Sequence, residues 1–132
     1  MKDLDITCVI SGSETGGKVA VFEEVVAPAS GPPRHTHRNQ LEVFHVLEGR
    51  IRFEVDGEVL VREAGSVAVV PAGAVHAFRN DGGESARIRF ELLPAGSSEE
   101  GFRLLLAGEV EDVGAFFDQY DMDLVGPPLD AP

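Results

Sequence analysis

The sequence predicts an all-β fold, a sandwich or barrel of short strands, on three observations. From about Ile6 to Leu93, short runs rich in β-branched and aromatic residues are separated by turn residues. Several of these runs alternate apolar and polar residues with a period of two, as strands with one buried face do. The chain has 132 residues, of which 43% are hydrophobic, so we expect a single domain over residues 1–132 with one core.

The first part of this region contains two clear strands. Residues 18–26 (KVAVFEEVV) have the length and β-branched content of a strand. Residues 27–33 (APASGPP) form a rigid loop, because three prolines and a glycine interrupt any ladder. Residues 41–47 are apolar on both faces apart from Glu42 and His45, which lie on opposite sides of the strand. We therefore expect this strand to be covered on both faces.

The second part of the region alternates more regularly. Residues 50–55 place Ile51, Phe53 and Val55 on one face and charged residues on the other. Asp56-Gly57 then predicts a tight hairpin turn, because both positions must tolerate positive φ. Further strands are expected over residues 58–62, 66–70, 75–79 and 87–91.

The segment after Leu93 predicts a short helical extension over residues 98–126. Ser98 is followed by two acidic residues, a typical helix start, and Gly108 is a typical stop. Asp112 can cap a second helix with an apolar stripe, which we expect to pack against the β domain. The members of the stripe are Val113, Phe116, Phe117 and Tyr120. Pro127-Pro128 is expected to end all regular structure.

Composition excludes several classes of function. The formal net charge is −12, and only two lysines accompany nine arginines, so nucleic-acid binding through phosphate contacts is not expected. The first ten residues lack the basic and apolar regions of a signal peptide, and no stretch is long enough to span a membrane. The single cysteine, Cys8, excludes an internal disulfide. We expect a cytoplasmic protein without membrane or nucleic-acid partners.

Three histidines and one glutamate have a spacing that predicts a metal site. His35 and His37 are two residues apart, so on a strand they project from the same face. Glu42 follows closely enough to return to them after a chain reversal, and His76 comes from a later strand. A single histidine in a strand is usually only a satisfied polar group. Together, imidazole and carboxylate donors suit Fe, Mn, Ni, Cu or Zn, and four protein ligands leave coordination positions open.

These residues form part of two longer motifs. The first is His35-Thr-His37-(four residues)-Glu42-(six residues)-Gly49, and the second is Gly65-(five residues)-Pro71-Ala-Gly73-Ala-Val-His76-(three residues)-Asn80. The pair resembles the two signatures of the cupin superfamily, over about residues 18–93. The second motif matches at every defined position, whereas Gly31 lies closer to the first histidine than the family pattern has it. The short spacing between the motifs is similar to that of compact, single-domain members related to quercetin-type dioxygenases.

The resemblance implies a fold, a metal and a ligand set. Cupins fold as a jelly roll, a double-stranded β-helix, with the metal inside the barrel, and they often form homodimers. The implied barrel covers about residues 6–93. The implied ligands are His35, His37, Glu42 and His76, which would hold one divalent transition metal (Fe, Mn, Ni, Zn or Cu). The implied partner is a small-molecule ligand.

Strand parity suggests which neighbours contact a substrate. Gln40 and Phe44 lie on the same side of their strand as Glu42, and Phe78 shares a face with His76. We expect Gln40, Phe44 and Phe78 to contact a substrate or to support the metal ligands. Phe78 can equally be an ordinary core residue.

Two kinds of function fit this prediction. The first is a metal-dependent enzyme acting on a small oxygen-bearing substrate by dioxygenase-like chemistry, or else by isomerase or lyase chemistry. In that case Glu42 can also serve as a catalytic base. The second is a non-catalytic module that binds a small molecule or metal as a sensor or store, because one fold supports both kinds of function.

Overall fold

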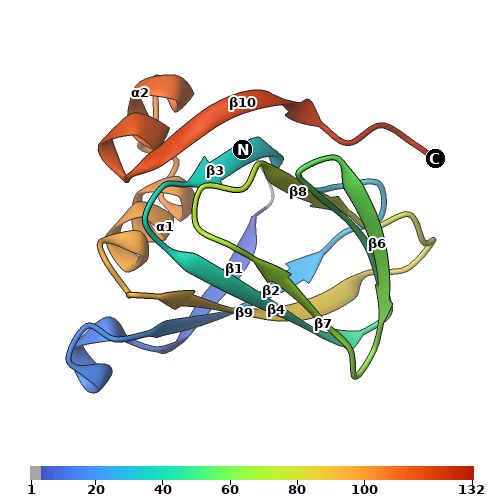
Figure 1. Ribbon diagram of the computed structural model, residues 1–132, viewed down its shortest axis with the longest axis horizontal. Coiled ribbons are helices and arrows are strands. Elements are labelled where there is room, and N and C mark those ends of the chain that lie inside the picture. The colour runs from blue at the N-terminus through green and yellow to red at the C-terminus, as the bar shows by residue number, and fades with distance from the viewer. Residues whose placement is uncertain (1–3) are drawn as a thin grey trace.

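The computed structural model describes residues 4–132 as two five-stranded antiparallel sheets that enclose one barrel (Figure 1). One sheet has the order β1-β2-β9-β4-β7 and the other the order β10-β3-β8-β5-β6. This is the predicted jelly roll. The strands are β1 (Asp5–Ile10), β2 (Ala20–Val26), β3 (Pro33–His37), β4 (Leu41–Glu48), β5 (Arg50–Val55), β6 (Glu58–Glu63), β7 (Val67–Val70), β8 (His76–Arg79), β9 (Ala86–Leu93) and β10 (Met122–Pro128). The helices are the short η1 (Gly12–Thr15), α1 (Ser98–Leu106) and α2 (Val113–Gln119).

The core lies between the inward faces of the two sheets. Every second residue of β4 and of β9 is buried, which agrees with the period of two in the sequence. Aromatic rings fill the middle of the barrel, with centroids 5.1 Å apart for Phe44 and Phe53 and 5.5 Å apart for Phe44 and Phe78. Contacts at these separations add to the stabilisation from burying the rings.

The outward face of β4 is not covered as predicted. Leu41 is 38% exposed, and Val67 and Val69 on the neighbouring β7 are 45% and 51% exposed. The apolar residues of this face therefore lie on the outside of their sheet, and residues 4–132 supply no second layer over it. His45 lies on the same outer face, where Nε2 contacts the carboxylate of Glu91. The expected homodimer, which would cover such a face, stays a prediction.

Two turns fix the positions of neighbouring strands. Asp56 and Gly57 have φ of 48° and 82°, which confirms the predicted hairpin between β5 and β6. Gly31 packs so closely on β8 that a Cβ atom there would overlap the carbonyl oxygen of Phe78. The loop before β3 is therefore held directly against β8, and this fixes where β3 begins.

The C-terminal extension forms two helices and then a strand. The helices lie together at one end of the barrel (Figure 1). Asp112 caps α2 as predicted, with Oδ1 accepting a hydrogen bond from the Ala115 backbone N–H at 3.0 Å. The apolar stripe of α2 is buried as predicted, with Phe116, Phe117 and Tyr120 in one cluster. Neither helix is long and apolar enough to cross a bilayer, nor is any other helix within residues 4–132.

Strand β10 was not predicted, because the sequence indicated only helices over residues 98–126, but regular structure does end at Pro127-Pro128 as expected, since β10 stops at Pro128. This strand pairs with β3, and Leu124 lies opposite His35 and Met122 opposite His37. It is the outermost strand of its sheet, where a missing N–H on proline leaves no ladder partner unsatisfied. The extension thus returns to the barrel beside the strand that carries two of the candidate ligands.

The side chain of Asn80 joins the end of β2 to the turn over residues 82–84. Its Nδ2 donates to the carbonyl oxygens of Val26 at 2.9 Å and Glu84 at 2.8 Å, and its Oδ1 accepts from the Gly82 N–H at 2.9 Å. Asn80→Ala leaves these buried groups unpaired, so we expect the free energy of unfolding in urea to fall by about 2–4 kcal/mol. The control, Glu84→Ala, removes an exposed side chain only. A loss below about 0.5 kcal/mol for Asn80→Ala would contradict this role.

Candidate metal centre

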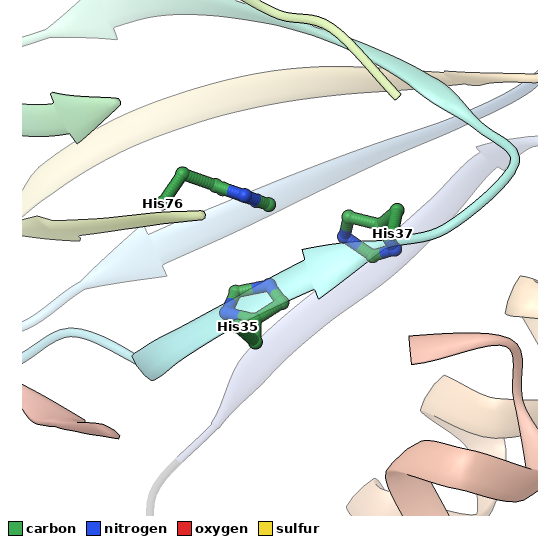
Figure 2. A group of neighbouring side chains, drawn as sticks. All are labelled: His35, His37 and His76. Carbon is green, nitrogen blue, oxygen red and sulfur yellow. The ribbon is translucent and has the colours of Figure 1, made fainter. Parts of the chain in front are cut away.

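Three histidine side chains meet inside the barrel (Figure 2). His35 and His37 come from β3, where their spacing puts both rings on the inward face, and His76 is the first residue of β8. His35 lies opposite His76 in the register of the two strands. One nitrogen of each ring lies within 4.8 Å of the others, and all three residues are buried.

Glu42 reaches the same point from the other sheet. Its Oε1 lies 2.9 Å from Nε2 of His76 and 3.3 Å from Nε2 of His37. The side chain is buried on the inward face of β4. The structure thus brings the three histidines together with Glu42 in contact with two of them, two residues coming from alternate positions on one strand and one each from two others.

Backbone carbonyl groups orient two of the rings. Nδ1 of His35 lies 2.7 Å from the Pro33 carbonyl oxygen, and Nδ1 of His76 lies 3.0 Å from that of Ala74. A carbonyl oxygen only accepts hydrogen bonds, so Nδ1 must carry the proton in both rings. A neutral ring then presents the lone pair of Nε2 to the barrel interior, as a metal-ligating histidine does.

A proton or a metal ion must lie between Nε2 of His76 and Oε1 of Glu42. Both nitrogens of His76 face oxygen acceptors, but a neutral imidazole has only one N–H. Burial opposes charge on this ring, yet its hydrogen bond to Glu42 raises the pKa of His76. Burial likewise opposes charge on Glu42, but the adjacent His37 and the hydrogen bonds from both rings hold the pKa of Glu42 well below its usual range. A proton fills the position between Nε2 and Oε1, and a metal ion can replace it.

The three histidines are placed to share one transition-metal ion, and Glu42 contacts two of their rings. Neighbouring ligands of an ion with bonds of about 2.0–2.1 Å lie about 3.0–3.4 Å apart. The separations of Glu42 Oε1 from Nε2 of His37 and of His76 are 3.3 Å, which lies within this range, and 2.9 Å, which lies just below it. Burial and the neighbouring rings of His76 and His37 lower the pKa of His35 to about 3, so His35 is neutral, as a ligand must be. Among the described residues, Nδ1 of His37 has no hydrogen-bond partner, although it is buried.

An apolar cavity of about 510 Å³ opens beside the cluster. Its wall includes His35, His37 and Glu42 together with aromatic residues from both sheets and both helices. The aromatic residues are Phe44, Phe78, Phe90, Phe102 and Phe117. The ring of Phe117 in α2 lies 5.8 Å from that of His35, edge to face. A cavity of this size holds a small organic molecule in contact with the cluster.

The residues expected to contact a substrate divide into two groups. Phe44 and Phe78 line the cavity, next to the cluster. Gln40 does not line it, because its Nε2 is turned toward the turn before α1. There it donates to the Pro94 carbonyl oxygen at 2.8 Å and to Oγ of Ser98 at 2.9 Å. Gln40 therefore holds the helical extension onto the barrel, and the expectation that it contacts a substrate is corrected.

Sequence reasoning missed two contributions to the cavity. The helical extension supplies Phe102, for which the sequence predicted no role, and Phe117, which was expected only to pack against the β domain. Glu24 on β2 also lines the cavity and is 8% exposed. A signal for Glu24 was present in the sequence. Glu23 and Glu24 are adjacent in a strand whose other residues are apolar, so one of the two acids must face inward.

Comparison with known proteins agrees with the motifs. The family model described as "Cupin domain" matches residues 22–93, more than half of the chain. The "Polyketide synthase CurC" of Streptomyces cyaneus is 34% identical over 70 residues, which cover 53% of this chain and 46% of that protein. The "Oxidoreductase OpS7" of Beauveria bassiana is 47% identical over 49 residues, which cover 36% of this chain and 16% of that protein. The chain therefore spans less than half the length of these curated relatives.

The fold also matches solved structures. One is a predicted oxalate decarboxylase from Thermotoga maritima, with a TM-score of 0.66 and 20% sequence identity over 69% of this chain and 80% of that one. At this identity the likeness establishes the fold alone.

Proposed function

The chain belongs to the cupin family, and from this premise we propose that it is a metal-dependent enzyme with dioxygenase-like chemistry on a small, oxygen-bearing, largely apolar substrate. The relative named as an oxidoreductase supports this reaction class. The observation that carries the proposal is the convergence of three buried histidines and Glu42 beside a cavity of about 510 Å³, whose wall includes His35, His37 and Glu42. A closed structural metal site has no need of an adjacent cavity of this size.

His35, His37, His76 and Glu42 would hold the metal. When bound, Fe, Mn, Ni, Cu or Zn would supply a Lewis acid and, for the redox-active ions, reactivity toward dioxygen. The carbonyl groups of Pro33 and Ala74 keep the rings of His35 and His76 oriented.

The other residues of the cavity bind the substrate and exclude water. The phenylalanine rings offer an apolar surface to the substrate body, which leaves its oxygen atoms to face the cluster. Glu42 is the candidate base, because Oε1 can accept a proton when the carboxylate is not occupied as a ligand. Its pKa, held low by the histidines, keeps it ionised at neutral pH.

Oxygen consumption tests this function. The Fe(II)-loaded protein is mixed with a panel of flavonoids, β-diketones and catechols, and oxygen uptake is followed with an electrode. We expect uptake with at least one member and a fall of about 100-fold or more in His37→Ala, because the first ligand shell is incomplete. His45→Ala is the matched control, since it removes an imidazole from the outer face only, and it should keep the full rate.

Two outcomes would contradict the proposal. Equal uptake by wild type and His37→Ala would mean that the consumption comes from free iron. Tight binding of a panel member by the loaded protein with neither uptake nor product would favour the non-catalytic binding module.

A further inference from the structure

Glu24 is the one acid on an otherwise apolar inward face of β2. The strand alternates, and its inward side chains are Ala20, Phe22, Glu24 and Val26, all of them buried. Ile6 on β1 and Ile88 on β9 lie directly opposite Glu24 in the two ladders. The carboxyl group therefore projects from an apolar wall into the cavity whose wall also includes His35, His37 and Glu42.

This carboxyl group lacks the partners that buried acids normally have. Its neighbour Glu23 faces outward and pairs with Arg87 at 2.9 Å and Arg89 at 2.7 Å. Glu42 is held by two histidines. Among residues 4–132, no side chain or backbone group forms a hydrogen bond or ion pair with the carboxyl group of Glu24, whose backbone is paired in the sheet. A carboxyl group that faces a cavity without a protein partner can bind a ligand placed in that cavity.

The surroundings keep this group in its neutral, acidic form. Burial raises the pKa of Glu24 to about 8, and the negative charges of Glu42 and Asp5 act in the same direction. The titratable residues that share the cavity wall are His35, His37 and Glu42. A neutral carboxylic acid donates one hydrogen bond through its O–H and accepts others through its carbonyl oxygen. It suits a carbonyl or hydroxyl oxygen of a ligand.

We propose that Glu24 is a specificity-determining residue that hydrogen-bonds a carbonyl or phenolic oxygen of an aromatic ligand whose chelating end lies at the histidine cluster. The proposal rests on the proposed function, because it requires a ligand in this cavity. The phenylalanine rings of the wall would contact the aromatic body between the two polar ends. A site with a buried hydrogen-bonding group discriminates strongly against ligands that leave this group unpaired.

Binding to the Zn(II)-loaded protein tests the proposal without turnover. The probes are 4-phenylcatechol, whose diol can chelate, and three derivatives of it. Each derivative carries one added hydroxyl group, at the ortho, meta or para position of the phenyl ring. Dissociation constants are measured by calorimetry. We expect at least one hydroxylated isomer to bind wild type about tenfold or more tightly than 4-phenylcatechol. Glu24→Leu should abolish this preference while changing the affinity for 4-phenylcatechol itself by less than about threefold.

Two further variants separate a specific role from a structural one. Glu24→Gln keeps a donor and an acceptor and should restore part of the preference. Glu23→Gln alters the adjacent, outward acid and should leave the preference intact. Absence of any preference in wild type, or a preference unchanged in Glu24→Leu, would overturn the proposal. Because Zn(II) supports binding without oxygen chemistry, these results are independent of whether the Fe(II)-loaded protein consumes oxygen.

Discussion

His76→Ala is expected to abolish stoichiometric metal binding. Wild-type protein that is loaded with Zn(II) or Fe(II) and then desalted should retain close to one ion per chain. The variant should bind at least about 100-fold more weakly, because loss of even an outer-shell partner of a ligand costs 10–100-fold in affinity. His76 is the ring whose Nε2 lies 2.9 Å from Glu42 and whose Nδ1 is fixed by the Ala74 carbonyl. Removing it takes away one donor and the orientation of a second.

The measurement is elemental analysis combined with competition against a chelating dye. His45→Ala serves as the matched control, since its ring lies on the outer face next to Glu91. Circular dichroism shows whether each variant is folded, and His35→Ala gives a second, independent removal of a candidate ligand. If wild type, His76→Ala and His35→Ala all retain the same trace amounts of metal, the site does not exist.

Glu24→Gln is expected to stabilise the ligand-free protein at pH 7.5. In the folded state burial raises the pKa of Glu24 to about 8 from an ordinary value of 4.5. Between these two values the folded carboxyl keeps its proton while the unfolded one has released it. Folding therefore takes up a proton, and the stability of wild type falls as the pH rises from about 4.5 to 8. Glutamine cannot ionise, so the variant escapes a loss of about 2–4 kcal/mol at pH 7.5.

The pH dependence is the decisive readout for this variant. The stability difference between Glu24→Gln and wild type, measured by urea unfolding, should grow by about 1 kcal/mol per pH unit between pH 5 and 8. It should be smallest below pH 4.5, where both states of wild type are protonated. Glu23→Gln, which removes an acid paired with Arg87 and Arg89, should give no such gain. A difference that stays constant from pH 5 to 8 would mean that Glu24 is ionised in the folded protein.

Stability and binding are thus opposed at Glu24. The side chain that weakens the ligand-free fold is the one proposed to recognise the ligand. Active and binding sites commonly retain groups that destabilise the free protein, because a group satisfied in advance is not available to a ligand.

Much of the barrel could be predicted because its signals are local. Alternation with a period of two identified most strands, and the Asp56-Gly57 pair identified the hairpin between β5 and β6. Strand β10 was missed because Pro127 and Pro128 oppose strand formation in isolation. Only its place at the edge of the sheet, next to β3, makes them tolerable.

The residues near the site also show which features local sequence predicts and which depend on tertiary contacts. Spacing alone put His35 and His37 on one face, because alternation is a property of any strand. Parity also put Gln40 on the inward side, and Gln40 is buried, but its amide binds the turn before α1 rather than lining the cavity. Parity gives the side of a strand and not the partner of a side chain. The partner depends on which loop packs there.

The sequence by itself predicted an all-β fold from its period and turn chemistry and a metal site from the spacing of four donor residues, and the resemblance of its two motifs to the cupin signatures implied the jelly roll. The tertiary structure alone decided what surrounds those donors. It closed an apolar cavity with rings from the helical extension, paired β10 with β3, and left Glu24 facing the interior without a partner among the described residues. These features arise where segments that are far apart in the sequence come into contact. Such contacts leave no periodic pattern in the sequence of either segment.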